Sequence, residues 1–338
     1  MRMDICLCSD NNYAKYMGTT IASILSNSKE DEEIYFHLIV DNDVTDDSKN
    51  KLLSLKKIKN CEMKFYTPDV EKYKKWFEVG SVKHLSAATF YRLDIHRLIQ
   101  DIDKVLYLDC DIIVNDSLKE LFEIDINNYY IITVKDIYFL DSKKDINESY
   151  FNSGVILVNS KLWLESNVSE LFENYYLNNY KNIYGDQDIL NYCLKEKVKY
   201  LDNIWNYFPL KSLYDGKPIK DIKIPHYAAA VKPWNDNGRV FYFADEFWKY
   251  YQLTPWFLER PIDAIQTILA QKYGDYEETK LKINDVKCFG IYHNRNTLEI
   301  VIFFIKIRIE MSFKNINKIA WFIPVKKWRE AFKRAFDI

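Results

Sequence analysis

The sequence predicts an α/β protein whose core is a largely parallel, doubly wound sheet. Short apolar, β-rich runs alternate with segments of helical spacing through the first 110 residues, which is the pattern of a parallel sheet covered by helices. The composition, 48% hydrophobic and 28% charged, is typical of a folded globular chain. The length of 338 residues allows one large domain with an appendage, or two modest domains.

The first third of the chain carries the clearest alternation. We expect, in order, a strand at 3–8, a polar loop at 9–12, a helix at 13–25, a strand at 33–40, a polar helix at 46–55 and a strand at 61–66. A helix at 89–99 and a buried strand at 104–108 follow. The second strand is stopped by Asp41-Asn42-Asp43. Polar residues thus follow successive strands, at the edge where open α/β sheets bind ligands.

The middle of the chain is expected to continue in the same way. Apolar runs at 130–134 and 151–158 predict strands, 185–194 predicts a helix, and 222–227 predicts a short strand ending in His226-Tyr227. No internal repeat or low-complexity linker is present. We expect a catalytic domain over residues 1–258 and a separate C-terminal helical region over 259–338.

Several function classes lose support at this stage. The formal net charge of −2 argues against a nucleic-acid binder. None of the eight glycines forms G-x-G-x-x-G or G-x-x-x-x-G-K-[ST], which disfavours a dinucleotide dehydrogenase and a P-loop NTPase. The six cysteines lack zinc spacing. No apolar run is long enough for a membrane span or a signal peptide, so we expect a cytoplasmic chain.

Asp109-Cys110-Asp111 directly follows the apolar strand at 104–108. Residues two apart in an extended segment point to the same side, so both carboxylates can converge on one divalent cation while Cys110 turns into the core. An acidic loop after a buried strand is the plainer explanation. A haloacid-dehalogenase-type phosphatase also has Asp-x-Asp after an apolar strand, although it normally places the motif on its first strand.

His226 and Lys232 are the second candidate pair. An isolated histidine is more often structural, but this one follows a predicted strand, and a lysine lies six residues on. An imidazole and an ammonium could both reach a metal–diphosphate group. Mixed carboxylate and imidazole ligation suits Mn²⁺, with Mg²⁺ as the alternative, better than Ca²⁺.

The third candidate segment is Tyr184-Gly185-Asp186-Gln187-Asp188, at the start of a predicted helix. One explanation is a helix N-terminus whose acids favour the helix dipole. The other places Asp186 or Gln187 at a bound sugar.

The order of these segments resembles glycosyltransferase family 8, and within it the bacterial lipooligosaccharide α-galactosyltransferases. The similarity covers about 230 residues and includes DICLCSDNNYAKYMGTTIASIL, TFYRLDI, DKVLYLDCDIIVNDSL, YFNSGVILVN, YGDQDILN and HYAAAVKPW. It implies a GT-A fold, a Rossmann-like nucleotide-sugar-binding mixed sheet flanked by helices. It also implies Mn²⁺-dependent, retaining transfer of galactose or glucose from a UDP-sugar to a glycan or glycolipid in cell-surface polysaccharide or lipooligosaccharide synthesis.

The resemblance assigns roles to residues of this chain. Tyr13 would stack on uracil and Lys232 would bind the diphosphate, while His226 would be the third metal ligand beside Asp109 and Asp111. Asp186 and Gln187 would act at the reacting sugar. The full set of implied donor-binding residues is Cys8, Ser9, Asp10, Asn12, Tyr13, Arg92, Asp109, Cys110, Asp136, Asn152, Asp186, Gln187 and Lys232. One departure is Ala229, where the family commonly has glycine.

Retention requires either a carboxylate nucleophile with two displacements or attack from the same face. Because Gln187 is a poor nucleophile, we favour same-face attack, with Asp186 or Asp188 as an electrostatic partner. A catalytically silent sugar-nucleotide binder remains an alternative, as does a self-glucosylating primer protein, since 26 tyrosines offer possible acceptors. The sequence leaves the donor sugar, the acceptor, whose site would include the loop at 81–88, and the oligomeric state open.

The last 38 residues differ in composition from the rest. Residues 301–338 carry nine basic and three acidic side chains, which gives +6 there and −8 elsewhere. The segments IFFIKIRI and WFIPVKKWREAFKRAF alternate apolar, aromatic and basic residues. This pattern suits an anionic membrane interface, which would hold the chain at the inner face of the cell membrane. The alternative is a C-terminal helix folded onto the domain.

Overall fold

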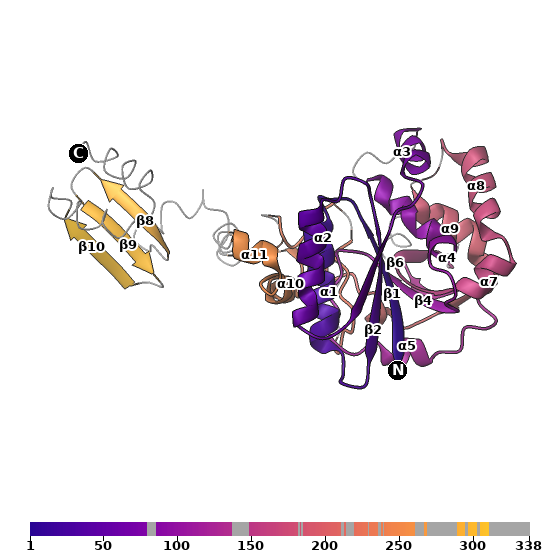
Figure 1. The fold of residues 1–338 in the computed structure, drawn as a ribbon, viewed down its shortest axis with the longest axis horizontal. Helices are drawn as coiled ribbons and strands as arrows, with labels where there is room; N and C mark the ends of the chain where they lie inside the picture. The colour runs from indigo at the N-terminus through magenta and orange to yellow at the C-terminus, as the bar shows by residue number, and fades with distance from the viewer. Residues whose placement is uncertain are drawn as a thin grey trace. The chain divides into compact units, whose positions relative to one another are not determined.

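The computed structural model describes residues 1–79, 86–136, 149–181, 183, 185–210, 213, 220–228, 230–235, 238, 240–260 and 267–268, and the backbone of 289–294, 297–302 and 305–310. The chain divides into two compact units, Met1–Lys272 and Tyr273–Ile338. The first unit holds every candidate site residue. Figure 1 shows its sheet and helices.

A seven-stranded mixed sheet organises the first unit, with strand order β3-β2-β1-β4-β6-β5-β7. Its strands are β1 (Arg2–Ser9), β2 (Glu33–Val40), β3 (Glu62–Tyr66), β4 (Lys104–Leu108), β5 (Ile131–Lys135), β6 (Phe151–Asn159) and β7 (Val198–Tyr200). Strands β3, β2, β1 and β4 are parallel, whereas β6 is antiparallel to both β4 and β5. The sheet is therefore largely parallel, as the alternation predicts, with β6 as the one reversed strand, and the mixed sheet implied by the family resemblance is present.

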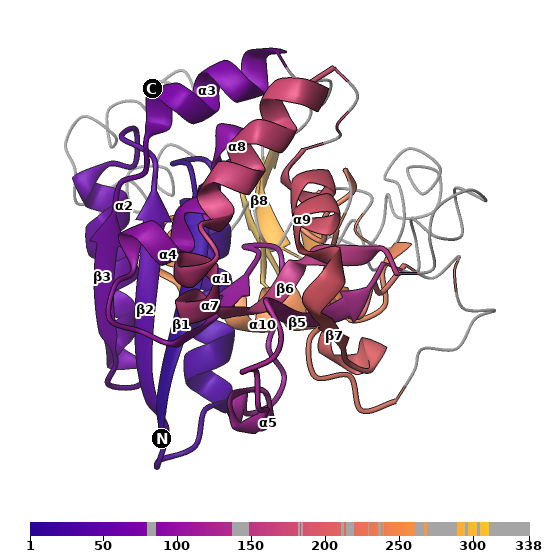
Figure 2. The same cartoon turned by 90° about the vertical axis from the view of Figure 1, so that its right-hand side faces the viewer.

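Helices cover both faces of this sheet (Figure 2). The helices are α1 (Ala14–Asn27), α2 (Asp46–Leu53), α3 (Val70–Val79), α4 (Ile95–Leu98), α5 (Lys119–Glu123), α7 (Ser160–Glu165), α8 (Val168–Asn179), α9 (Asp186–Leu194), α10 (Ala244–Tyr251) and α11 (Pro255–Glu259). In both views α1, α2 and α10 lie on one face, and α3, α4, α7, α8 and α9 lie on the other.

The two faces of β1 show how its sequence places it in the centre. Met3, Ile5 and Leu7 pack into the core beneath α1, while Cys6 and Cys8 pack into the core under the opposite helices. Burial on both faces explains why residues 5–8 of the strand form an apolar run without alternation. Each fully buried aliphatic side chain contributes about 2 kcal/mol.

Two predicted elements differ in form. The helix expected at 89–99 is a 3₁₀ helix, η2 (Ala87–Asp94), followed by the single turn α4. The strand expected at 222–227 forms only isolated bridges, between Ile112 and His226 and between Tyr207 and Pro225. These bridges still hold His226 beside the segment that follows β4.

The second unit contains a three-stranded antiparallel sheet made of β8 (Phe289–Asn294), β9 (Thr297–Ile302) and β10 (Ile305–Glu310). This differs from the helical region that we expected over 259–338. The period-two alternation of IKIRIE in β10 favours a strand over a helix. The second basic segment, at 321–336, lies outside the described residues. Among the described residues, no helix is long and apolar enough to cross a membrane.

Candidate active site

Asp109 and Asp111 follow β4 at the carboxyl edge of the sheet, where β1 and β2 also end. The peptide N–H of Asp109 donates to the carbonyl of Gly154 in β6 (2.8 Å), and the carbonyl of Asp111 accepts from the N–H of Tyr227 (2.9 Å). These two bonds connect the acidic turn to β6 on one side and to the His226 segment on the other. As predicted, Cys110 turns into the core, away from the two carboxylates. Its thiol is buried and donates to the carbonyl of Cys8.

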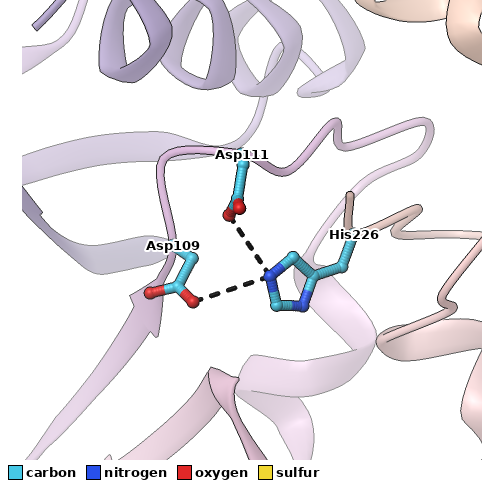
Figure 3. Close-up of side chains that lie close together, drawn as sticks. All are labelled: Asp109, Asp111 and His226. Carbon is cyan, nitrogen blue, oxygen red and sulfur yellow. Dashed lines mark ion pairs between the residues drawn. The ribbon is translucent and has the colours of Figure 1, made fainter. Parts of the chain in front are cut away.

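The three candidate metal ligands converge (Figure 3). Nε2 of His226 lies 3.5 Å from Oδ2 of Asp109 and 3.2 Å from Oδ1 of Asp111. One ligand atom from each residue lies within 4.8 Å of the others. Two carboxylate oxygens and one imidazole nitrogen fit a divalent cation such as Mn²⁺ and leave coordination positions open for phosphate oxygens.

Lys232 completes the charge balance of this group. Its ammonium contacts Oδ2 of Asp111 and donates to the carbonyl of Tyr227 at 2.9 Å. Burial alone would raise the pKa of Asp111, but the nearby charges of Lys232 and His226 outweigh it and hold that pKa well below its usual value. The Asp111 carboxylate is therefore ionised throughout the neutral range, as a metal ligand must be.

Gly154 makes room for this convergence. A Cβ atom at this position would lie 2.2 Å from Cε1 of His226 and 2.8 Å from Oδ2 of Asp109. No side chain fits there without displacing both candidate ligands. We singled out Asn152 in the FNSG segment from the sequence but not Gly154.

Replacing Gly154 with alanine should therefore displace the His226 ring. We expect a loss of about 100-fold in turnover, because misplacing a catalytic group by about 1 Å costs that much. Gly18→Ala is the matched control, since its Cβ would lie 2.7 Å from the Trp256 ring, away from these residues. Steady-state kinetics and thermal melts on both variants check this. Equal turnover in the two variants would contradict it.

Arg92 is the buried cation on the other side of Asp109. Its guanidinium pairs with Oδ1 of Asp109 (2.9 Å) and Oδ2 of Asp186 (3.0 Å), and it donates to the carbonyl of Ser153 (2.6 Å). Burial would lower the pKa of Arg92, but the two carboxylates raise it. This arginine joins the end of β4 to the start of α9, which unites the metal triad with the predicted sugar pocket.

The predicted sugar-pocket residues also lie together, at the end of β5 and at the starts of α9 and β6. Nε2 of Gln187 donates to Oδ2 of Asp136 (3.0 Å), and Nδ2 of Asn152 donates to the same oxygen (3.3 Å). Oε1 of Gln187 accepts from the N–H of Ser153 (3.0 Å). Burial raises the pKa of Asp186, although the Arg92 charge and a hydrogen bond from Thr89 oppose the rise.

The loop after β1 lies next to the acidic turn, because β1 pairs with β4. Oδ1 of Asp10 accepts from the N–H of Tyr13 (3.0 Å), and the Tyr13 ring packs edge-on against Trp234 with centroids 6.1 Å apart. Burial chiefly raises the pKa of Tyr13, and the negative charge of Asp111 adds to it. Asn12 is exposed, whereas Cys8 and Ser9 are buried, so contacts from the latter two to a donor would come from their backbone.

Some of the predicted positions cannot be placed. Tyr184, Ala229 and residues 81–85 of the suggested acceptor loop lie outside the described residues. Conversely, the structure adds residues that the sequence did not indicate. Besides Gly154, they include Tyr107, whose hydroxyl donates to Oδ1 of Asp109 (2.6 Å), and Asn206, which contacts His226 (2.8 Å).

The comparisons with known proteins agree with this geometry. Residues 4–238 match the family described as Glycosyl transferase family 8. A putative glycosyltransferase of Haemophilus influenzae is 34% identical over 69% of this chain and 73% of that protein. The lipopolysaccharide 1,2-glucosyltransferase of Escherichia coli is 31% identical over 73% of this chain and 77% of the relative.

The fold is also similar to solved structures. The galactosyltransferase LgtC, in complex with donor and acceptor sugar analogues, superposes with a TM-score of 0.65 and 26% identity, over 75% of this chain and 96% of that structure. The phosphatase alternative has no support from these matches. With a GT-A fold and a match over most of its length, the chain belongs to glycosyltransferase family 8 and is a glycosyltransferase of glycan biosynthesis.

Proposed function

We propose that this enzyme transfers galactose or glucose from a UDP-sugar to a glycan or glycolipid acceptor, with retention and with Mn²⁺ or Mg²⁺. The observation that carries the proposal is the convergence of Asp109, Asp111 and His226 beside Lys232 at the carboxyl edge of the sheet. Support for a hexose and for a bacterial surface glycan comes from the names of the relatives, a lipopolysaccharide glucosyltransferase and a galactosyltransferase.

The leaving group would be handled by the triad and Lys232. A bound divalent cation would supply Lewis-acid stabilisation of the negative charge that develops on UDP. The Lys232 ammonium lies between the Asp111 carboxylate and the Tyr227 carbonyl, from where it can bind a diphosphate oxygen. Tyr13, beside Trp234 on the neighbouring loop, offers an aromatic face to the nucleobase.

The contacts of Asp186 and Gln187 favour same-face attack over a double displacement. Asp186 is 4% exposed, and its two carboxylate oxygens are engaged by Arg92 and Thr89. A carboxylate held in this way serves to fix Arg92 rather than to attack a sugar. The Gln187 amide, held by Asp136 and Ser153, would bind the sugar. An active site mutant of LgtC in which glutamine is replaced by glutamate has been solved, which also supports a role for this glutamine.

The test is UDP release from UDP-galactose, UDP-glucose and UDP-N-acetylhexosamines, with Mn²⁺ or with EDTA, by the wild type and by Asp109→Asn. We expect slow hydrolysis of one hexose donor, abolished by EDTA and by the substitution. The intact mass of the protein after the reaction separates hydrolysis from self-glycosylation. Silence on every donor, together with no binding of UDP and Mn²⁺, would contradict the proposal, whereas silence with UDP still bound would favour the silent binder.

We further propose that the basic C-terminal segment holds the enzyme at the inner face of the membrane. The support is compositional, since 301–338 carries a charge of +6. Replacing Lys326, Lys327, Arg329, Lys333 and Arg334 with glutamine should weaken binding to anionic vesicles at least tenfold, because each basic residue near such a surface contributes up to ~1 kcal/mol. Vesicles of neutral lipid are the control. Unchanged sedimentation with anionic vesicles would reject this role.

A further inference from the structure

A chain of side-chain amides runs from β6 to His226. Asn206 is 9% exposed. Its Oδ1 lies 2.8 Å from Nδ1 of His226, and its Nδ2 lies 2.9 Å from Oδ1 of Asn152. The same Asn152 oxygen lies 2.9 Å from the backbone nitrogen of Gly154. Three hydrogen bonds in series therefore connect a backbone N–H of β6 to one nitrogen of the imidazole.

The direction of each bond in this series is fixed by the first. The Gly154 N–H can only donate, so the atom of Asn152 that faces it must be the amide oxygen. The atom of Asn206 that faces this oxygen must then be the NH₂ group, and the remaining oxygen of Asn206 must face Nδ1 of His226. Because that oxygen can only accept, Nδ1 must carry the ring proton in the neutral histidine.

The contact of the Asn152 nitrogen with Asp136 independently gives the same orientation of the Asn152 amide. Its Nδ2 donates to Oδ2 of Asp136 (3.3 Å), which also accepts from Nε2 of Gln187 (3.0 Å). An ionised carboxylate has no proton to donate, so the nitrogen of Asn152 must face Asp136. Asn152 is thus held in one orientation from both ends, and the orientation of Asn206 follows from it.

We infer that Asn206 is a positioning residue that accepts the Nδ1–H of His226 and so keeps Nε2 directed at Asp109 and Asp111. Nε2 is the nitrogen that lies 3.5 and 3.2 Å from the two carboxylates. Imidazoles that bind metals characteristically donate their other N–H to an oxygen, which fixes the ring orientation. The inference rests on the proposed function for its purpose, because Nε2 acts as a ligand only when a cation lies between it and the two carboxylates.

Nitrogen NMR of the full-length chain labelled at histidine reads the tautomer directly. The chain has five histidines, and the His226 signals are assigned by their loss in His226→Gln. The wild type should show a protonated Nδ1 at neutral pH. In Asn206→Leu, which has a similar shape but no acceptor, Nδ1 should be unprotonated. Asn206→Asp keeps an acceptor and should keep the wild-type pattern.

Mn²⁺ affinity in the presence of UDP, measured from the electron paramagnetic resonance signal of free Mn²⁺, is the second measurement. Asn206→Leu should bind Mn²⁺ 10–100-fold more weakly, which is the usual cost of losing such a partner, while Asn206→Asp should bind more tightly than the leucine variant. Asn159→Leu is the matched control. Asn159 is 6% exposed and bonds to Ile126, Tyr129 and Leu162, so this change costs stability without touching His226.

The possible results separate this inference from the proposed function. A wild-type His226 without a proton on Nδ1, or equal Mn²⁺ affinity in the wild type and Asn206→Leu, would overturn the role of Asn206. If the wild type binds no Mn²⁺ but shows the Nδ1 proton, and Asn206→Leu loses it, the proposed metal dependence fails and the orienting role of Asn206 stands. Asn159→Leu should melt at a lower temperature and keep wild-type Mn²⁺ affinity, so weaker Mn²⁺ binding by it would attribute the effect to lost stability and overturn the inference.

Discussion

Replacing Asp111 with asparagine should lower UDP release by at least about 10³-fold while the chain stays folded. The change removes one of two negative charges from the triad and leaves the Lys232 ammonium without its carboxylate partner. A metal electrophile supplies several kcal/mol to such a reaction, and each 1.4 kcal/mol corresponds to about tenfold in rate. Initial rates over a range of Mn²⁺ concentrations measure the loss, and thermal melts report the fold.

Asp116→Asn is the matched control for this prediction. Asp116 lies in the same loop, five residues on, but its carboxylate is partly exposed and pairs with Lys223. Exposed pairs of this kind contribute ~0–1 kcal/mol, so this variant should keep wild-type rates. If Asp111→Asn retained a rate close to that of Asp116→Asn, Asp111 could not be a metal ligand.

Replacing Arg92 with methionine should cost about 3–5 kcal/mol of unfolding free energy at pH 7, besides abolishing UDP release. The guanidinium is 6% exposed and pairs with both Asp109 and Asp186. Its removal leaves buried carboxylates without a counter-charge, which is the costly way to break a buried ion pair. Arg92→Lys keeps the charge but lacks the planar fork that reaches two carboxylates, so its loss should be smaller. Urea unfolding measures each free energy.

The loss in Arg92→Met should also depend on pH. Burial already raises the pKa of Asp186 above the ordinary 3.8, against the opposing charge of Arg92. Without Arg92 that pKa rises further, so between pH 4 and 7 the folded state binds more protons than the unfolded state. Stability then falls as pH rises, and the difference from the wild type should widen from pH 4 to 7.

Lys119→Met is the control for both measurements on Arg92. Its ammonium is partly exposed and pairs with the exposed carboxylate of Asp31, so its removal should change stability by less than about 1 kcal/mol. A loss in Arg92→Met that is no larger than this, or one that is independent of pH, would contradict the role of Arg92 as the buried counter-charge.

The fold could be predicted from the sequence wherever one face of an element differs from the other, or where a polar turn ends an apolar run. β2 and β4 begin and end where expected. The direction of β6 could not be predicted, because its central residues 155–158 are buried on both faces and form a uniform apolar run, which is the same in either direction. The alternation of strands and helices favoured parallel pairing, and the mixed order became expected only through the family resemblance.

Some residues of the candidate site could likewise be predicted from the sequence, and others could not. Asp109 and Asp111 could be recognised because they follow a parallel strand, at the edge where ligands bind. Gly154 and Asn206 could not, because their roles depend on which side chains the fold brings against them. β6 enters the sheet from the crevice edge, so its functional residues come at its start, and only the family resemblance indicates one of them, Asn152.

The strand order also has a consequence for the way the chain is synthesised. β1 can pair with β2 as soon as both have left the ribosome, and β4 can then join on the other side. β5 has no place beside β4, because β6 must enter between them. Until Asn159 emerges, the nascent chain keeps an open edge on β4, which is the kind of edge that aggregates. The strand that closes this edge also carries Asn152 and Gly154, so the same step brings one side of the crevice into place before β7, His226 and Lys232 have been made.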